Sequence, residues 1–67
     1  MEIHIDSDDF SKACEVRMLL KMEERVSISQ IDGVAVVSGS RKECAEILEA
    51  ATHRGLDIAV IKVVEDR

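Results

Sequence analysis

The dipeptide Asp32-Gly33 lies at the middle of the chain, between two short runs that are rich in β-branched residues. An Asp-Gly pair favours a two-residue type I′ turn, because both central residues of that turn need a positive φ. The flanking runs "VSISQI" and "VAVVS" therefore predict a β-hairpin in which Ile31 pairs with Val34. The chain must then build the rest of its fold around this central hairpin.

The segments on the two sides of the hairpin follow a similar order. Residues 2–6, "EIHID", alternate apolar and polar side chains and predict a half-buried strand. A helix is expected over about 8–25, where strong helix formers occur without Gly or Pro. Ser40 and Glu43 form a capping box at the start of a second helix, and Gly55 suits its left-handed end. That helix has one apolar stripe, consisting of Cys44, Ile47, Leu48 and Ala51.

The element order is strand-helix-strand-strand-helix-strand, and "IHIDSDDFSKAC" is echoed by "VAVVSGSRKEC" about 30 residues later. Two interleaved strand-helix-strand units predict a single α+β domain over residues 1–67 with the ferredoxin-like plait (βαββαβ). This fold is a four-stranded antiparallel sheet with two helices on one face. The expected strand order is fourth, first, third, second, which leaves the other sheet face uncovered.

The closing strand, residues 58–64 of "LDIAVIKVV", is apolar on both sides. Alternation would place Ile58, Val60 and Val64 on one side and Ala59, Ile61 and Val63 on the other. Such a run is typical of a strand that is covered on both faces, but the plait covers only one. We therefore expect an interface on the open face, formed by Ile31, Val34, Val36, Ala59, Ile61 and Val63.

The first helix carries a second apolar stripe, Cys14, Met18 and Met22, at i, i+4 and i+8. It lies away from the sector around Val16 that should pack on the sheet, so we assign it to the interface as well. Sulfur ligands could hold Cu(I), but methionine at helical spacing is more often adaptable packing. No metal or other cofactor is therefore predicted.

In length and strand-helix order the chain resembles the heavy-metal-associated domain. That family binds metal through a Cys-x-x-Cys pair at the start of the first helix. The corresponding stretch here, "SDDFSKAC", has one cysteine, Cys14, and acidic residues where the first cysteine would stand. The resemblance implies the topology and does not carry the metal function over. A small-ligand or metal-binding domain is kept as an alternative function.

The turn "SGSRKE" opens the second helix with two cations beside it. Backbone amides there could receive a phosphate or carboxylate, so Ser38, Gly39, Ser40, Arg41 and Lys42 form a weak candidate anion site. The turn lacks the spacing of a nucleotide-binding loop, and the capping box already uses some of its donors. Helix capping accounts for these residues without a ligand.

The net charge of −5 and the absence of aromatic residues from every expected strand argue against nucleic-acid binding. No nucleophile-base pair is visible, which predicts a protein that is not an enzyme. No apolar run approaches the length of a membrane span. The two cysteines, Cys14 and Cys44, should lie at opposite ends of antiparallel helices, and their low number favours a cytoplasmic location.

These observations favour a small regulatory module that binds other proteins. We expect a homodimer that modulates or inhibits a protein partner, and a basic partner suits the charge better than an acidic one. An alternative is an acidic phage-type inhibitor that imitates the charge of DNA to block a nucleic-acid-binding protein.

Overall fold

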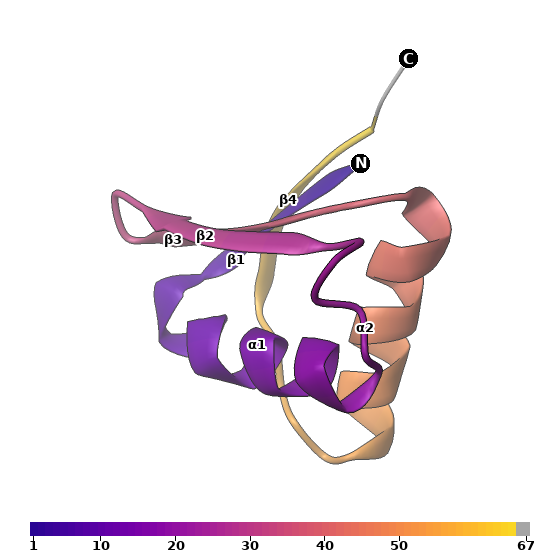
Figure 1. Cartoon of the computed structure of the whole chain (residues 1–67). Coiled ribbons are helices and arrows are strands. Elements are labelled where there is room, and N and C mark those ends of the chain that lie inside the picture. Colours follow the sequence, from indigo (N-terminus) through magenta and orange to yellow (C-terminus); the bar gives the residue numbers. More distant parts are fainter. Residues whose placement is uncertain (66–67) are drawn as a thin grey trace.

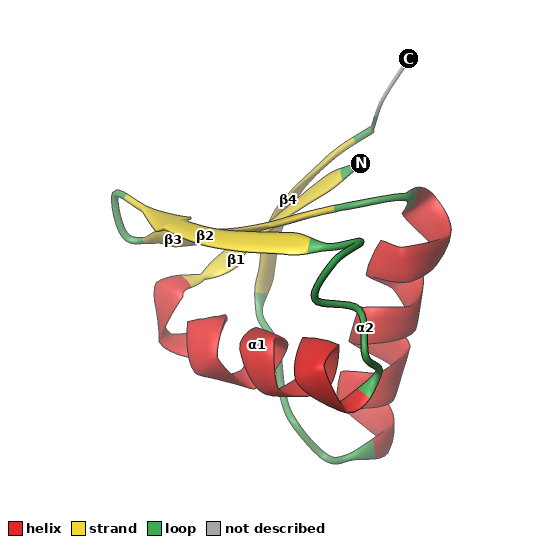
Figure 2. Ribbon diagram, in the orientation of Figure 1, coloured by secondary structure: helices red, strands yellow, loops and turns green. Residues whose placement is uncertain are grey.

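The structure, a computed structural model, describes residues 1–65 (Figures 1 and 2). Along the chain the elements are β1 (Glu2–Asp6), the 3₁₀ turn η1 (Ser7–Asp9), α1 (Phe10–Leu19), β2 (Ser27–Ile31), β3 (Val34–Ser38), α2 (Arg41–His53) and β4 (Val60–Val64).

The four strands form one sheet in the order β2-β3-β1-β4, and every neighbouring pair is antiparallel. Both helices lie on the same side of this sheet, below it in Figure 1. The α+β class and the strand order are confirmed. β2 and β4 are the two edge strands, and the face away from the helices is open.

The central hairpin is confirmed residue by residue. Asp32 and Gly33 have φ values of 48° and 78°, and Ile31 pairs with Val34. Because the side chains of a strand alternate, this register fixes which residues face the helices. Ala35 and Val37 point into the core, whereas Val34, Val36 and Ser38 lie on the open face.

The core is aliphatic and lies between the sheet and the two helices. β1 and β3 supply one wall of it and α1 and α2 supply the other. Its buried members are Ile3, Ile5, Ala13, Val16, Met22, Val26, Ala35, Val37, Cys44, Ile47 and Ala51.

The first helix is shorter than the expected 8–25, and this is a correction. A separate 3₁₀ turn precedes it, capped by the Asp6 carboxylate, which accepts from the Asp8 amide at 2.9 Å. At its other end Lys21 adopts φ 56°, while the amides of Lys21 and Met22 donate to the carbonyls of Met18 and Arg17. This is the Schellman ending, which is normally built on glycine.

The early end of α1 has a tertiary cause. Met22 and Val26 are only 3% and 1% exposed, so the chain must leave the helix to place both in the core. The Arg17 guanidinium fixes the segment that leads from α1 back to the sheet, because it donates to the carbonyl of Val26 at 3.1 Å. Burial of the two side chains therefore outweighs the helix propensity of residues 21–24.

The second helix begins and ends as expected. The Ser40 hydroxyl accepts from the Glu43 amide, and the Ser40 amide donates to the Glu43 carboxylate, both at 3.2 Å. At the far end Gly55 has φ 72°, and the Leu56 amide donates to the carbonyl of Ala51 at 2.9 Å. Both capping predictions are confirmed.

Candidate functional site

β4 is the most exposed apolar element among residues 1–65. None of its five residues is buried, and four of them are aliphatic. The exposed fractions are 44% for Val60, 60% for Ile61, 48% for Val63 and 37% for Val64. β4 pairs with β1 on one side only, so its outer backbone edge faces solvent.

The side chains of β4 do not alternate as the sequence suggests, because the strand contains a register shift. Val63 lies opposite Ile3 and Val60 lies opposite Ile5, while no β1 residue is paired with Ile61. An extra residue of this kind is a β-bulge, and it changes which face the following residues occupy. Val60 and Val63 therefore both lie on the side of buried Ile3 and Ile5.

The expected grouping of Ala59, Ile61 and Val63 on one face is consequently wrong. Val63 belongs to the helix side of the sheet, and Ile61 occupies the bulge. Ala59 precedes the strand, and its backbone is used in two hydrogen bonds, one from its amide to Asp9 and one from the Asp6 amide to its carbonyl. Val64 and Lys62, opposite Glu2 and His4, are the β4 residues on the open face.

Asp9 fixes the start of β4, which the sequence did not reveal. Asp9 is 7% exposed as a residue, and its carboxylate accepts from the Ala59 amide at 2.8 Å and pairs with the Lys12 ammonium at 3.0 Å. Lys12 also donates to the carbonyl of Asp57 at 2.9 Å. The hydrogen bond from Ala59, followed by Lys12, lowers the pKa of Asp9 below its ordinary value. In the sequence Asp9 had the pattern of a simple helix-start charge.

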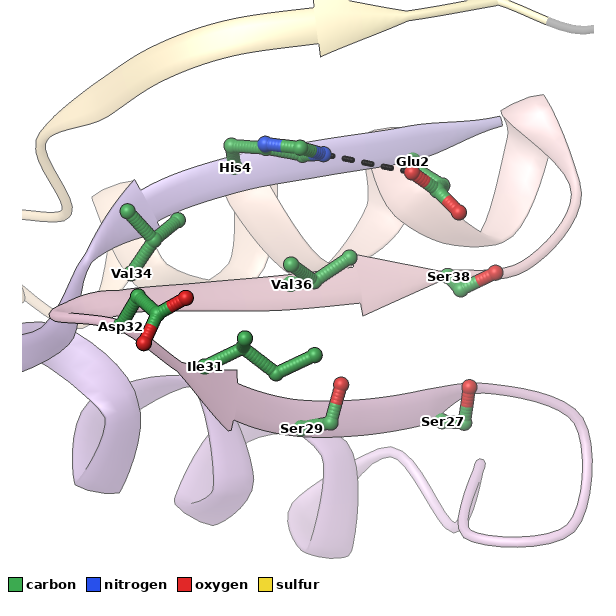
Figure 3. A pocket seen from close by; sticks show the side chains of 9 residues that line it. All are labelled: Glu2, His4, Ser27, Ser29, Ile31, Asp32, Val34, Val36 and Ser38. Atoms are coloured by element: carbon green, nitrogen blue, oxygen red, sulfur yellow. Dashed lines mark hydrogen bonds and ion pairs between the residues drawn. The ribbon is translucent and has the colours of Figure 1, made fainter.

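The open face of the sheet contains a hollow of about 560 Å³ (Figure 3). Its floor is apolar, and in Figure 3 the side chains of Ile31, Val34 and Val36 lie over β2 and β3. Ile31 is 59% exposed, and the two valines are half-buried. We call this the open-face hollow; it is lined by Glu2, His4, Ser27, Ser29, Ile31, Asp32, Val34, Val36 and Ser38.

Carboxylates stand at both ends of the open-face hollow. Glu2 lies at one end, where its carboxylate and the His4 ring are 3.2 Å apart, and Asp32 lies at the hairpin end. The nine lining residues include no Lys or Arg. The hollow is therefore an apolar floor with an acidic rim.

The predicted methionine stripe does not form one surface. Met18 is 64% exposed and Cys14 is half-buried, but Met22 is 3% exposed and belongs to the core. The reason is the left-handed residue Lys21, which takes Met22 off the helical spacing. Placing Met22 in an interface is therefore corrected.

The turn proposed as an anion site has most of its donors occupied. The Gly39 amide donates to the carbonyl of Met1, and the amides of Ser40 and Glu43 are used in the capping box. The Ser40 hydroxyl and amide lower the pKa of Glu43, so a carboxylate charge sits at this helix end. Arg41 pairs with Glu65 at 3.4 Å. These contacts add no support for an anion site over Ser38, Gly39, Ser40, Arg41 and Lys42.

Among residues 1–65, no group of three or more His, Cys, Asp or Glu could hold a metal ion. Cys14 and Cys44 are not joined by a disulfide. Within the same residues, neither helix has the length and apolar character that a membrane span requires. The chain matches no family model, no curated protein and no solved structure.

Proposed function

We propose that this protein is a non-enzymatic interaction module that pairs with a second copy through β4 and regulates a protein partner. The observation that carries the proposal is β4 itself, an edge strand with four exposed aliphatic residues out of five. Native proteins usually keep such an edge short, charged or covered, because it pairs readily with another strand.

The outer edge of β4 has no neighbouring strand within one chain, and a second copy of β4 would supply one. Val60 and Val63 lie on the helix side of the sheet, yet they are 44% and 48% exposed because β4 has no outer neighbour. Antiparallel pairing of two β4 strands would join the two sheets and satisfy the outward backbone groups. It would also bring the helix-side valines of both copies together, which favours association by apolar burial.

The opposite edge of the sheet limits this association to a pair. β2 presents Ser27, Ser29 and Gln30 in a strand whose residues are mostly exposed. A contact of β4 with β2 would leave further edges free and generate a chain of molecules, whereas β4 with β4 closes on itself.

We include in this proposal the finer fold, a ferredoxin-like plait, which is supported by the strand order and by both helices lying on one sheet face. The proposal also keeps the cytoplasmic location expected from the sequence. Two cysteines that do not bond to each other are compatible with a reducing compartment.

The test is sedimentation equilibrium of the wild type and of Val63→Lys. We expect a dimer at micromolar concentration and a dissociation constant at least about tenfold weaker in the variant, because a charge replaces apolar area at the contact. Met18→Lys is the matched control, since Met18 is 64% exposed on α1, the helix that contacts β2 at the opposite edge of the sheet. A wild type that stays monomeric, or a Met18→Lys effect equal to that of Val63→Lys, contradicts pairing through β4.

A further inference from the structure

We propose that the open-face hollow binds a cationic amphipathic helix of the partner protein. This inference rests on the proposed function in one respect, that the module has a protein partner. It adds the place of binding and the chemistry of the ligand.

Strand pairing arranges the open face in three rows. Glu2, Ser38 and Ser27 form the first row, His4, Val36 and Ser29 the second, and Asp6, Val34 and Ile31 the third. On β4, Val64 extends the first row and Lys62 the second. The apolar residues are adjacent in the second and third rows. Acidic residues occur at both ends, with Glu2 in the first row and Asp6 and Asp32 at the hairpin end.

The open face suits a helical ligand better than an extended peptide. A sheet face offers side chains, whereas its backbone donors and acceptors are already used between the strands. An extended peptide laid on it would leave its own amides and carbonyls without partners, while a helix satisfies them internally. An apolar stripe at i, i+3, i+4 and i+7 would then rest on Ile31, Val34 and Val36.

The acidic rim selects a cationic partner. The first and third rows are four residues apart along a strand, which corresponds to about 13 Å. A helix covers that length in about nine residues, which is two to three turns. Lys or Arg residues at the two ends of such an apolar stripe would therefore lie beside Glu2 and Asp32. The nine lining residues include no Lys or Arg, and Lys62, opposite His4 on β4, is the one cation among the strand-paired residues of this face.

The same charges disfavour the other occupants. Two copies packed through this face would bring Glu2, Asp6 and Asp32 against an identical set that outnumbers the one paired cation of the face, Lys62, which is unfavourable. The rim would also repel a nucleic-acid backbone, and no aromatic side chain lines the hollow for base stacking. The second copy thus fits β4, and a cationic helix fits the open face.

The test is fluorescence anisotropy with a labelled synthetic peptide of about three helical turns, carrying a leucine stripe flanked by lysines. Two further peptides are compared with it: one of the same composition in scrambled order and one with Glu in place of Lys. We expect the wild type to bind the first peptide with a dissociation constant below about 100 µM and the other two at least tenfold more weakly. Equal binding of all three peptides, or binding of none, overturns the proposal.

Variants locate the site. Glu2→Gln combined with Asp32→Asn removes the rim charges, and Asn-Gly still favours the same turn, so the fold is preserved. We expect about tenfold weaker binding at low salt. Glu23→Gln combined with Glu24→Gln removes the same charge from exposed positions away from the hollow and should change binding less than twofold. Equal effects of the two pairs would mean that net charge alone attracts the peptide, which contradicts a site in the hollow.

The apolar floor is tested by Ile31→Ser, at a position 59% exposed and therefore compatible with folding. It should weaken binding about fivefold, whereas Met18→Ser should leave it unchanged. Sedimentation of the same samples separates the two proposals. Val63→Lys should bind the peptide as a monomer, and Ile31→Ser should remain a dimer that binds the peptide weakly.

Discussion

The two edge strands of the sheet, β2 and β4, have equal lengths of five residues and opposite chemistry. β2 exposes two serines and a glutamine, and Ile31 is its one exposed aliphatic residue; β4 exposes four aliphatic residues and one lysine. An edge with polar side chains offers little apolar area to a second strand, whereas β4 exposes aliphatic side chains at four of its five positions. We therefore expect a second strand to add to the sheet at β4 and not at β2.

The two edges are also held to the sheet in different ways. β2 is tied to β3 by the two-residue turn Asp32-Gly33, a connection local in sequence. β4 follows α2, and its start is held by side chains from the far end of the chain, with Asp9 bonded to Ala59 and Lys12 to Asp57. This difference predicts that the interaction edge depends on a few long-range polar contacts.

The largest expected effect comes from Asp9→Asn, which removes the charge that anchors β4. The Ala59 amide and Lys12 lose a carboxylate partner, so we expect the melting temperature to fall by roughly 10 °C. In hydrogen exchange, the amides of β4 should lose more protection than those of β2. Asp8→Asn removes the same charge at the neighbouring exposed position and is the control. Equal loss of protection in both edges would contradict a specific anchoring role of Asp9.

The same anchor predicts a loss of stability in acid. Because the pKa of Asp9 is lower in the folded state than in the unfolded state, the unfolded chain takes up the proton first as pH falls. The stabilisation is therefore complete above the ordinary pKa and is lost as pH falls from about 5 toward 3. Urea unfolding across this range should show that the free energy of unfolding falls more steeply with pH for the wild type than for Asp9→Asn. Parallel curves for the two proteins would exclude Asp9 as a source of the acid sensitivity.

A smaller effect is expected at the other edge from Gly33→Ala. Gly33 has φ 78°, and a Cβ there would meet no atom within 4 Å, so the cost is backbone strain and not a clash. We expect a loss of about 1 kcal/mol in the free energy of unfolding, measured with urea. Dimer formation through β4 should be unchanged at a concentration where the variant is folded; a weakened dimer would indicate that the two edges are coupled.

The smallest effect concerns the loops that lead into the two edges, which begin with the same Schellman ending. Gly55 fills the left-handed position before β4, and Lys21 fills it before β2. Lys21→Gly should stabilise the fold by about 0.5 kcal/mol, because relief of the left-handed strain exceeds the entropy that glycine adds to the unfolded chain. Leu20→Gly, one residue earlier with ordinary helical φ, should destabilise in the same urea experiment. A destabilising Lys21→Gly would show that the Lys21 side chain contributes more than its backbone strain.

Several parts of the candidate site could be predicted from the sequence because they depend on near neighbours. Turn chemistry placed Ile31 opposite Val34, and strand alternation then put Val34 and Val36 on the open face. Val63 was misplaced because nothing in "AVIKVV", where aliphatic residues stand on both sides of Lys62, marks the position of the bulge. Met22 was misplaced because no glycine marks the end of α1.

By itself the sequence determined the element order, the hairpin register, the capping box at Ser40 and the left-handed stop at Gly55, since each depends on residues within a few positions of one another. The tertiary structure alone decided where α1 ends, which faces β4 presents and what Asp9 does. These features depend on contacts between distant residues, such as the bond between Ala59 and Asp9, which are 50 positions apart. At the end of α1 and in β4, burial of the core and pairing with β1 outweigh the local secondary-structure preference of the residues. A sequence pattern reports only that local preference.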